Sequence, residues 1–161
     1  MKTLLIQRHA KSDWNDASLA DHERPLNKRG KRQAPAMGEL LRREDLLPDL
    51  ILCSSARRAR KTAEAIAEAS GYPGEIRLSR DLYAAPPEAY LEALHGLPDE
   101  YACVMVVGHN PGLEELLDVL TGESARLPTA ALAQVVLDVE HWSQVSQAPR
   151  GKLIHIWLPD V

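Results

Sequence analysis

Short apolar runs alternate along this chain with longer segments of helical periodicity, and this alternation limits the fold more than any other feature. Within the runs, apolar and polar residues show little alternation, which is typical of strands buried on both faces. The runs occupy residues 3–7, 49–53 and 102–107, with a shorter one at 76–78 and two late ones at 132–139 and 152–157.

Segments with apolar residues at helical spacing fill the intervals between these runs. In the first such segment Ala34, Met37 and Leu41 share one face, and Asn27 stands where a helix cap is expected. The expected helices cover residues 28–43, 57–70, 87–95 and 111–120. Strands alternating with helices predict an α/β fold, a three-layer sandwich whose mostly parallel central sheet has helices on both faces.

The length of the chain, 161 residues, suits one domain, and no linker or repeat divides it. We therefore expect a single domain over residues 1–161. No interval leaves room for a large insertion, so we expect no cap domain. A polar loop at residues 143–151 is expected to join the last two strands.

Charge and composition limit the partners and the cellular location that we expect. The net charge is −4, which gives no electrostatic reason to expect nucleic acid or an anionic membrane. No run approaches the roughly 20 apolar residues of a membrane helix, and the apolar start is too short for a signal peptide. Cys53 and Cys103 lie in apolar runs without a CxxC pair, so we expect buried thiols in a cytoplasmic protein.

Polar and cationic residues follow three of the expected strands at the point where each strand ends. Arg8 and His9 follow the first strand, residues 54–60 with their arginines follow the second, and His109 follows the strand at 102–107. Ligands of open α/β sheets bind beyond the carboxyl ends of the strands. If these strands are neighbours, one pocket receives both histidines and several arginines.

Such a pocket suits a phosphoryl group. Arginine offers a planar fork of donors to phosphate oxygens, and helices that begin near Arg57 and Pro111 would point free N–H groups at the same place. A neutral imidazole is a competent nucleophile toward phosphorus near pH 7. These residues alone leave open which histidine attacks. A histidine after a strand is often only a surface residue, and a run of arginines is often a solvated helix face.

Three motifs in these segments resemble those of the histidine phosphatase superfamily. Arg8-His9-Ala10 resembles its Arg-His-Gly signature, residues 54–62 are similar to its Ser-Pro-x-x-Arg-Ala-x-x-Thr motif, and residues 108–111 match its second histidine motif. Arg24-Pro25-Leu26 followed by Gly30, together with the short length, resembles the SixA-type phosphohistidine phosphatase branch. The resemblance implies a phosphoglycerate mutase-like fold, and an enzyme that needs no cofactor or metal.

The resemblance also implies a role for individual residues. His9 would be the nucleophile, Arg8 and Arg58 would bind the phosphoryl oxygens, and His109 would complete the pocket. Arg58 is favoured over Arg57 because the motif places its arginine directly before Ala59. Arg24, Lys11 and Asn110 are further candidates for contact with substrate or phosphate. The remaining histidines, His22, His95, His141 and His155, are interpreted as surface or hydrogen-bonded residues.

The chain departs from the family pattern at two positions, and its proton donor is open. Ala10 replaces a glycine, which is tolerable if its φ is negative, and Ser55 replaces a proline. The acidic candidates for protonating a leaving group are Asp81 and Glu88, of which Asp81 is favoured. A phosphohistidine substrate needs less help from an acid, because imidazole can depart already protonated.

The leading hypothesis is hydrolysis through a phosphohistidine on His9, with a phosphorylated protein or a small phosphorylated molecule as substrate. One alternative is a phosphoglycerate mutase-like or small-molecule phosphomonoesterase activity, although mutases usually need extra segments that enclose the substrate. Another is a non-catalytic module that binds phosphorylated ligands. A metal hydrolase is disfavoured because two histidines without clustered carboxylates make a poor divalent site.

Overall fold

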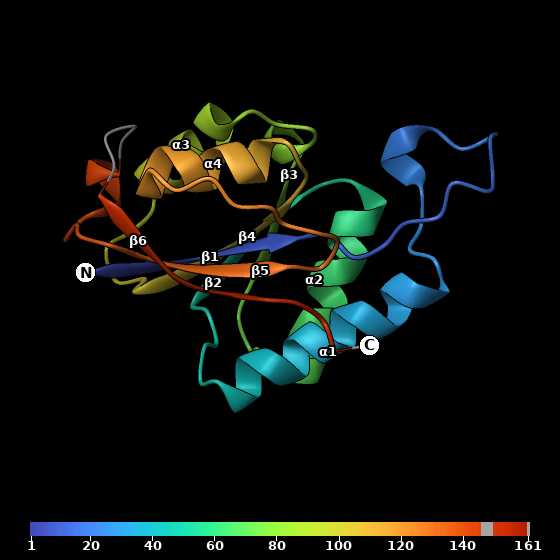
Figure 1. The fold of residues 1–161 in the computed structure, drawn as a ribbon, viewed down its shortest axis with the longest axis horizontal. Helices are drawn as coiled ribbons and strands as arrows, with labels where there is room; N and C mark the ends of the chain where they lie inside the picture. Colours follow the sequence, from blue (N-terminus) through green and yellow to red (C-terminus); the bar gives the residue numbers. More distant parts are fainter. Residues whose placement is uncertain (146–149, 161) are drawn as a thin grey trace.

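The computed structural model describes residues 1–145 and 150–160. Its centre is one six-stranded sheet with the order β3-β2-β4-β1-β5-β6 (Figure 1). The strands are β1 (Lys2–Arg8), β2 (Leu50–Ser54), β3 (Ile76–Ser79), β4 (Cys103–Gly108), β5 (Leu132–Leu137) and β6 (Gly151–Trp157). The four strands β3, β2, β4 and β1 are mutually parallel, whereas β5 pairs antiparallel with both β1 and β6.

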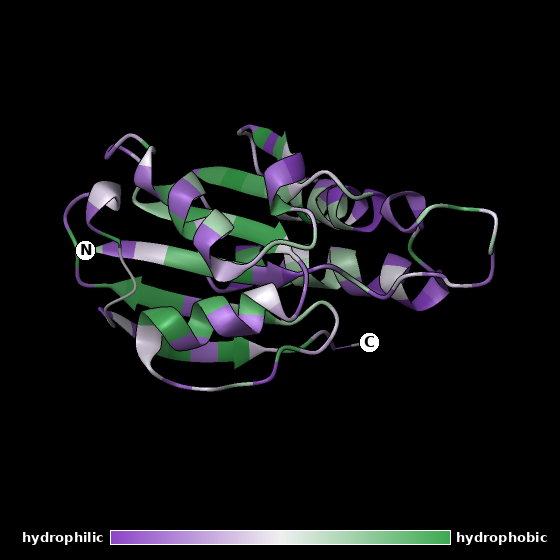
Figure 2. Ribbon diagram, turned by 90° about the horizontal axis from the view of Figure 1, so that it is seen from above, coloured by the Kyte–Doolittle hydropathy of each residue, from purple (hydrophilic) through white to green (hydrophobic). Residues whose placement is uncertain are grey.

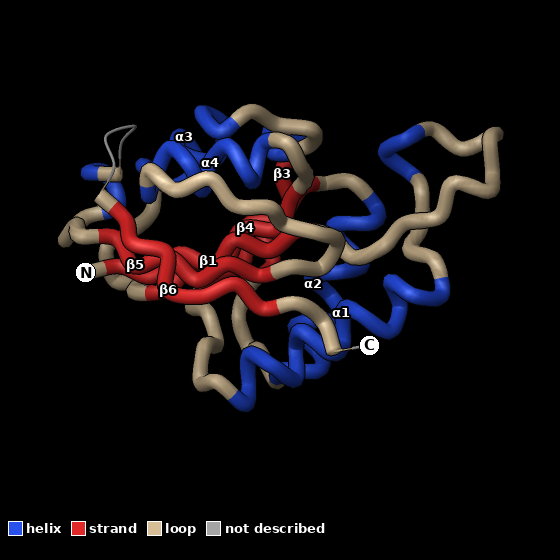
Figure 3. Tube along the Cα trace, in the orientation of Figure 1, coloured by secondary structure: helices blue, strands red, loops and turns tan. Residues whose placement is uncertain are grey.

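Helices cover both faces of this sheet, so the molecule has three layers (Figure 3). Two of them, α1 (Lys28–Arg43) and α2 (Arg57–Ser70), lie side by side on one face. The other two, α3 (Pro87–His95) and α4 (Gly112–Thr121), pack on the opposite face. The three-layer, mostly parallel α/β fold expected from the sequence is therefore confirmed, and the described residues contain no cap domain.

The central strands are apolar on both faces because they fill two separate cores. In β1, Leu4 and Ile6 pack with α3 and α4, whereas Leu5 packs with α1 and α2. Successive side chains of a strand point to opposite faces, so a strand between two helical layers needs no polar face. Figure 2 shows the result as apolar strands in the middle and helices that are apolar on one side only.

Element boundaries differ from the expected ones by a few residues, mainly in the last third of the chain. The strand expected over 132–139 ends at Leu137, and the helix expected from 111 begins at Gly112. A short 3₁₀ turn, Trp142–Gln144, begins the expected loop at 143–151, of which residues 146–149 lie outside the described part. No helix in the described part is long and apolar enough to span a membrane.

The segment between β1 and α1 extends beyond the end of the sheet and returns through a 3₁₀ turn, Asp21–Glu23. The start of α1 packs closely against the beginning of this segment. The Asn27 side chain caps the helix by accepting from Gly30 N, and Lys11 N donates to Gln33 Oε1 at 3.0 Å. A Cβ on Gly30 would lie 2.1 Å from Lys11 O, so only glycine permits this approach.

Candidate active site

The carboxyl ends of three neighbouring strands meet in one pocket of about 250 Å³. Because β4 lies between β1 and β2, the residues that follow these strands become neighbours in space. His9 comes after β1, His109 after β4, and Arg58 from the first turn of α2 after β2. The pocket is lined by Arg8, His9, Lys11, Ser12, Trp14, Asp21, Arg24, Arg58, His109, Asn110 and Thr129.

His9 is buried and held in one tautomer by the backbone. Its Nδ1 lies 2.7 Å from the carbonyl oxygen of Ala10, a group that can only accept a hydrogen bond. Nδ1 therefore carries the imidazole proton, and Nε2 keeps its lone pair. The ring lies 5.2 Å from that of His109, measured between centroids. His9 thus lines the pocket with one ring nitrogen, Nε2, that keeps its lone pair.

His109 has the complementary arrangement. Its Nε2 lies 2.7 Å from Ser54 Oγ, which already accepts a hydrogen bond from Ala56 N. The Ser54 hydroxyl hydrogen is then free to be donated to Nε2, and Nδ1 carries the proton of the ring. This Nδ1 is buried and has no partner among the residues that the structure describes. His109 therefore offers an unused N–H donor to a ligand in the pocket.

Both histidines are neutral at pH 7. Burial, together with the positive charges of Arg58, Arg8 and Arg24, lowers the pKa of His9 to about 4, against the hydrogen bond to Ala10 that raises it. Burial likewise lowers the pKa of His109 to about 3, with His9 and Arg58 as further causes. A neutral imidazole keeps the lone pair that an attack on phosphorus needs.

Two arginines bring cationic donors that the protein leaves unused. Arg8 Nη1 donates to Leu127 O at 3.0 Å, and Arg58 Nη1 donates to Asp21 O at 2.8 Å. The Nε atoms of both guanidinium groups are buried without a partner. Together with His109 Nδ1, they give the pocket three buried N–H donors without acceptors. Buried donors are rarely left unpaired, and an anion with several oxygens would satisfy all three.

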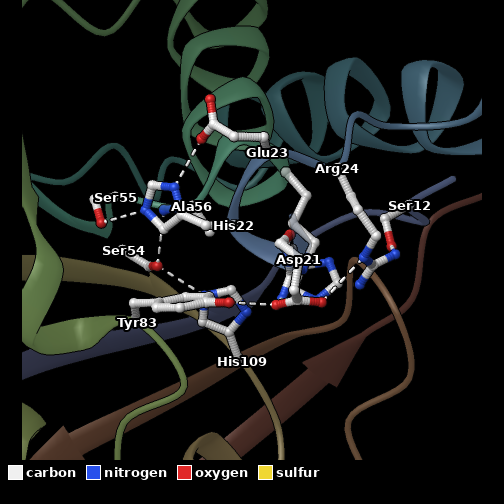
Figure 4. A network of polar contacts seen from close by, with 12 residues as sticks. Ser12, Asp21, His22, Glu23, Arg24, Ser54, Ser55, Ala56, Tyr83 and His109 are labelled. Carbon is white, nitrogen blue, oxygen red and sulfur yellow. Dashed lines mark hydrogen bonds and ion pairs between the residues drawn. The ribbon is translucent and has the colours of Figure 1, made fainter. Parts of the chain in front are cut away.

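Asp21 is the one carboxylate that lines the pocket, and both of its oxygens accept hydrogen bonds although the side chain is about half exposed. Arg24 Nε donates to Oδ1 at 3.0 Å, Arg58 Nη2 donates to Oδ2 at 3.1 Å, and the Tyr83 hydroxyl also donates to Oδ2. Figure 4 shows the Asp21 carboxylate between Tyr83 and the side chain of Arg24. The hydrogen bond from Tyr83, followed by those from the arginines, holds the pKa of Asp21 well below its usual range. Asp21 is therefore ionised and is no proton donor.

The motif residues around the pocket have structural roles that explain their spacing. Thr62 Oγ1 accepts from Ala10 N at 2.9 Å and donates to Arg58 O, so it ties α2 to the backbone that follows His9. Ala10 is not among the residues with positive φ, so its side chain causes no strain. Ser55, which replaces the family's proline, contacts His22 Nε2 at 2.8 Å. This departure from the pattern gains a contact with the segment before α1.

The other predicted residues fall into two groups. Lys11, Arg24 and Asn110 line the pocket, and Arg24 already donates through Nε and Nη1 to Asp21, Ser12 and Asp13 O. Asn110 Nδ2 donates to Leu127 O and to Glu114, so it fixes the loop that holds Arg8. Asp81, in contrast, is exposed and borders a separate hollow with Leu82 and Glu92. Its position does not support a role as the acid.

Sequence reasoning did not find Trp14, Asp21 and Thr129 among the residues that line the pocket, nor Tyr83, which bonds to Asp21. Tyr83 stands two residues after the favoured Asp81, and its ring lies 5.6 Å from that of His109. His22, interpreted as a surface or hydrogen-bonded residue, is indeed hydrogen-bonded, to Glu23 and Ser55, and its ring packs edge-on against Tyr83 at 4.8 Å. The one available signal was the position of Asp21, three residues before Arg24 in a motif already noted. Among the described residues, no three His, Cys, Asp or Glu side chains gather so as to hold a metal ion.

The amino-acid sequence of this chain is similar to those of a known protein family and of several known proteins. The family model of the histidine phosphatase superfamily (branch 1) matches residues 4–83. An uncharacterized chloroplastic protein of Arabidopsis thaliana is 36% identical over 144 residues, which cover 83% of this chain and 66% of that protein.

Two solved structures are similar over nearly their whole length. A candidate phosphohistidine phosphatase SixA of Agrobacterium tumefaciens is 30% identical, with 98% of each chain covered and a TM-score of 0.85. The protein histidine phosphatase SixA in complex with tungstate is 25% identical, with 98% of this chain and 97% of that chain covered and a TM-score of 0.84.

Proposed function

Because the chain belongs to the histidine phosphatase superfamily, in its SixA-type branch, and is a phosphatase, we propose that it removes the phosphoryl group from phosphohistidine in proteins. The observation that carries the proposal is the arrangement around His9. Its lone-pair nitrogen, Nε2, shares a pocket with three buried N–H donors that lack a partner. A nucleophile and a cradle for phosphoryl oxygens therefore occur together.

In the first step His9 Nε2 attacks phosphorus, and a bond from Nε2 to phosphorus forms as the substrate's phosphorus–nitrogen bond breaks. The donors of Arg8, Arg58 and His109 stabilise the charge on the three phosphoryl oxygens. The departing imidazole takes the electron pair of the broken bond. It leaves as a neutral molecule when its other nitrogen has already gained a proton from solvent.

In the second step water attacks the phosphoryl group on His9, and the bond to Nε2 breaks. The electron pair returns to Nε2, and the water proton passes to phosphate or solvent. Since Nδ1 keeps its proton and its hydrogen bond to Ala10 O, His9 separates from the phosphoryl group as a neutral imidazole. The nucleophile is thereby restored in its starting tautomer.

The absence of an available acid at the pocket supports phosphohistidine over an alkyl phosphate ester. Asp21 is the one carboxylate among the residues that line the pocket, and it is ionised between two arginines and Tyr83. An alkoxide leaving group needs a proton at the moment of departure, whereas a protonated imidazole does not. The lack of a cap domain leaves the pocket open to a side chain on a protein.

A substrate panel tests this proposal. Wild type and His9→Ala are assayed on a phosphohistidine peptide, phosphoserine peptide, p-nitrophenyl phosphate and 3-phosphoglycerate, the last with a mutase readout. We expect fastest turnover of the phosphohistidine peptide and none by His9→Ala. An alkaline quench should preserve a phosphoenzyme that an acid quench destroys. Equal activity of His9→Ala, or mutase turnover above hydrolysis, contradicts the proposal.

We also propose that the protein is cytoplasmic. Cys53 and Cys103 are free thiols, and free thiols are compatible with a reducing cytoplasm.

A further inference from the structure

A second hollow, of about 360 Å³, lies next to the catalytic pocket. We call it the basic groove, and it is lined by Pro25, Leu26, Lys31, Arg57, Lys61 and Ala65. Arg57, Lys61 and Ala65 are spaced four residues apart, so they form one stripe along α2. Lys31 faces them from the first turn of α1. The groove therefore runs between the first turns of these two helices.

The basic groove and the catalytic pocket share a wall. Arg57 in the groove and Arg58 in the pocket are consecutive residues. Leu26 in the groove forms a β-bridge with Ser12, which lines the pocket. Arg57 Nη1 also reaches Glu23 O, at 3.5 Å, on the turn that carries Asp21. A chain whose phosphorylated side chain enters the pocket would lay its neighbouring residues along the groove.

The groove is basic although the protein as a whole is acidic. Three of its six lining residues are cations and none is an acid, whereas the net charge of the chain is −4. The hollow beside α4 has the opposite character, with Glu114, Glu115 and Asp118. Cations thus gather in the hollow that adjoins the catalytic pocket through Arg57 and Leu26.

These cations have little compensation within the protein. Lys61 Nζ lies 3.4 Å from Glu64, but both side chains are about half exposed (48% and 46%), and such surface pairs contribute little. Lys31 has no ion pair among the residues that the structure describes. Beneath the charges, Pro25, Leu26 and Ala65 give an apolar floor. An acidic segment that also carries an apolar side chain would complement both features.

We propose that the basic groove binds an acidic segment beside the phosphohistidine of a protein substrate, an inference that rests on the proposed function. A small phosphorylated molecule fills only the catalytic pocket and gains nothing from the groove. The groove would therefore favour protein substrates by lowering KM, while the chemical step at His9 stays unchanged.

Charge reversal at two exposed positions tests the inference. The variant Lys31→Glu/Lys61→Glu is compared with wild type on two phosphohistidine peptides, one with acidic and one with uncharged flanks, and on phosphoramidate. We expect KM for the acidic peptide to rise about tenfold at unchanged kcat. KM for the uncharged peptide and for phosphoramidate should stay within about twofold. Added salt should weaken binding of the acidic peptide by wild type in the same way.

Two controls separate docking from other effects. Arg150→Glu/Lys152→Glu makes the same charge change at exposed positions at the start of β6, and it should leave every KM unchanged. The milder Lys31→Gln/Lys61→Gln should give a smaller rise for the acidic peptide, and urea midpoints check that each variant is folded.

The possible failures are distinguishable. If wild type hydrolyses both peptides with equal KM, and the reversed variant behaves like wild type, the groove inference is overturned and the proposed function stands. If the control pair raises KM as much as the groove pair, net charge explains the effect and the groove inference again falls. If wild type hydrolyses p-nitrophenyl phosphate but neither phosphohistidine peptide, the proposed function itself is overturned.

Discussion

Two arginines that are adjacent in the sequence have different surroundings and different expected roles. Arg58 is buried in the catalytic pocket, while Arg57 is half-buried in the basic groove. We expect Arg58→Ala to lower kcat/KM for phosphoramidate by about 10²–10³, because a preorganised donor to the phosphoryl oxygens is lost. Arg57→Ala should change kcat/KM for phosphoramidate by no more than about threefold. Steady-state kinetics on both variants make the comparison, and equal losses would refute the assignment.

Asp21 places a negative charge against the two arginines that it orders. In Asp21→Asn, inorganic phosphate should inhibit several-fold more strongly, because the repulsion between two anions is removed. At the same time kcat should fall about tenfold, because Arg58 loses the partner that fixes its guanidinium group. A variant that merely unfolds the segment would lose both properties together.

Asp16→Asn is the matched control for this change. Asp16 lies on the same segment, and its side chain bonds only to Ser18 among the described residues. The Asp16→Asn substitution should leave both kcat and the inhibition constant of inorganic phosphate unchanged. Weaker phosphate inhibition in Asp21→Asn would mean that Asp21 helps to bind the anion, against the electrostatic argument.

At the scale of elements, the site depends on how tightly α1 approaches the backbone after β1. In Gly30→Ala the new Cβ would lie 2.1 Å from Lys11 O, so the helix or the segment must shift. We expect a loss of about 2 kcal/mol in the free energy of unfolding, together with reduced activity. Gly96→Ala is the control, since a Cβ there meets nothing within 4 Å and the backbone φ is negative. Urea unfolding of both variants checks this, and equal midpoints would contradict it.

The sequence predicted the elements well because strands and helices leave local periodic patterns. It also predicted that His9 and His109 share a pocket, because both follow a buried strand. It could not find the contact of Asp21 with Tyr83, since the two residues are 62 positions apart and meet only once the sheet is assembled. The sequence also could not show that Asp81 lies outside the residues that line the pocket: the 3₁₀ turn Arg80–Leu82 leaves Asp81 exposed and brings Tyr83 to Asp21 instead.

At the scale of the whole molecule, two buried neutral histidines link stability to pH. The pKa of His9 is about 4 in the folded protein and about 6.5 in an unfolded chain, so the unfolded state binds more protons between these values. The free energy of unfolding should therefore fall as pH is lowered from 6.5 to 4. The contribution of His9 is on the order of 3 kcal/mol.

Urea unfolding between pH 7.5 and 4 measures this dependence. In His9→Gln the slope should be shallower than in wild type, because one of the two linked groups is gone. His155→Gln is the control, since His155 is exposed on β6. Identical slopes for wild type and His9→Gln would show that His9 is not buried in its neutral form.

In the part of the chain that the structure describes, no cap domain covers the pocket at the end of the sheet, and under the proposed mechanism this bears on the fate of a phosphorylated His9. A phosphoryl group on His9 would then be open to bulk water and would have no protected interval in which to wait for a chosen acceptor. The enzyme would hydrolyse the phosphoryl groups that it accepts rather than pass them on to another molecule, and transfer would run in one direction. Only acceptors present at concentrations approaching that of the solvent, such as added glycerol, would divert a fraction of the phosphate.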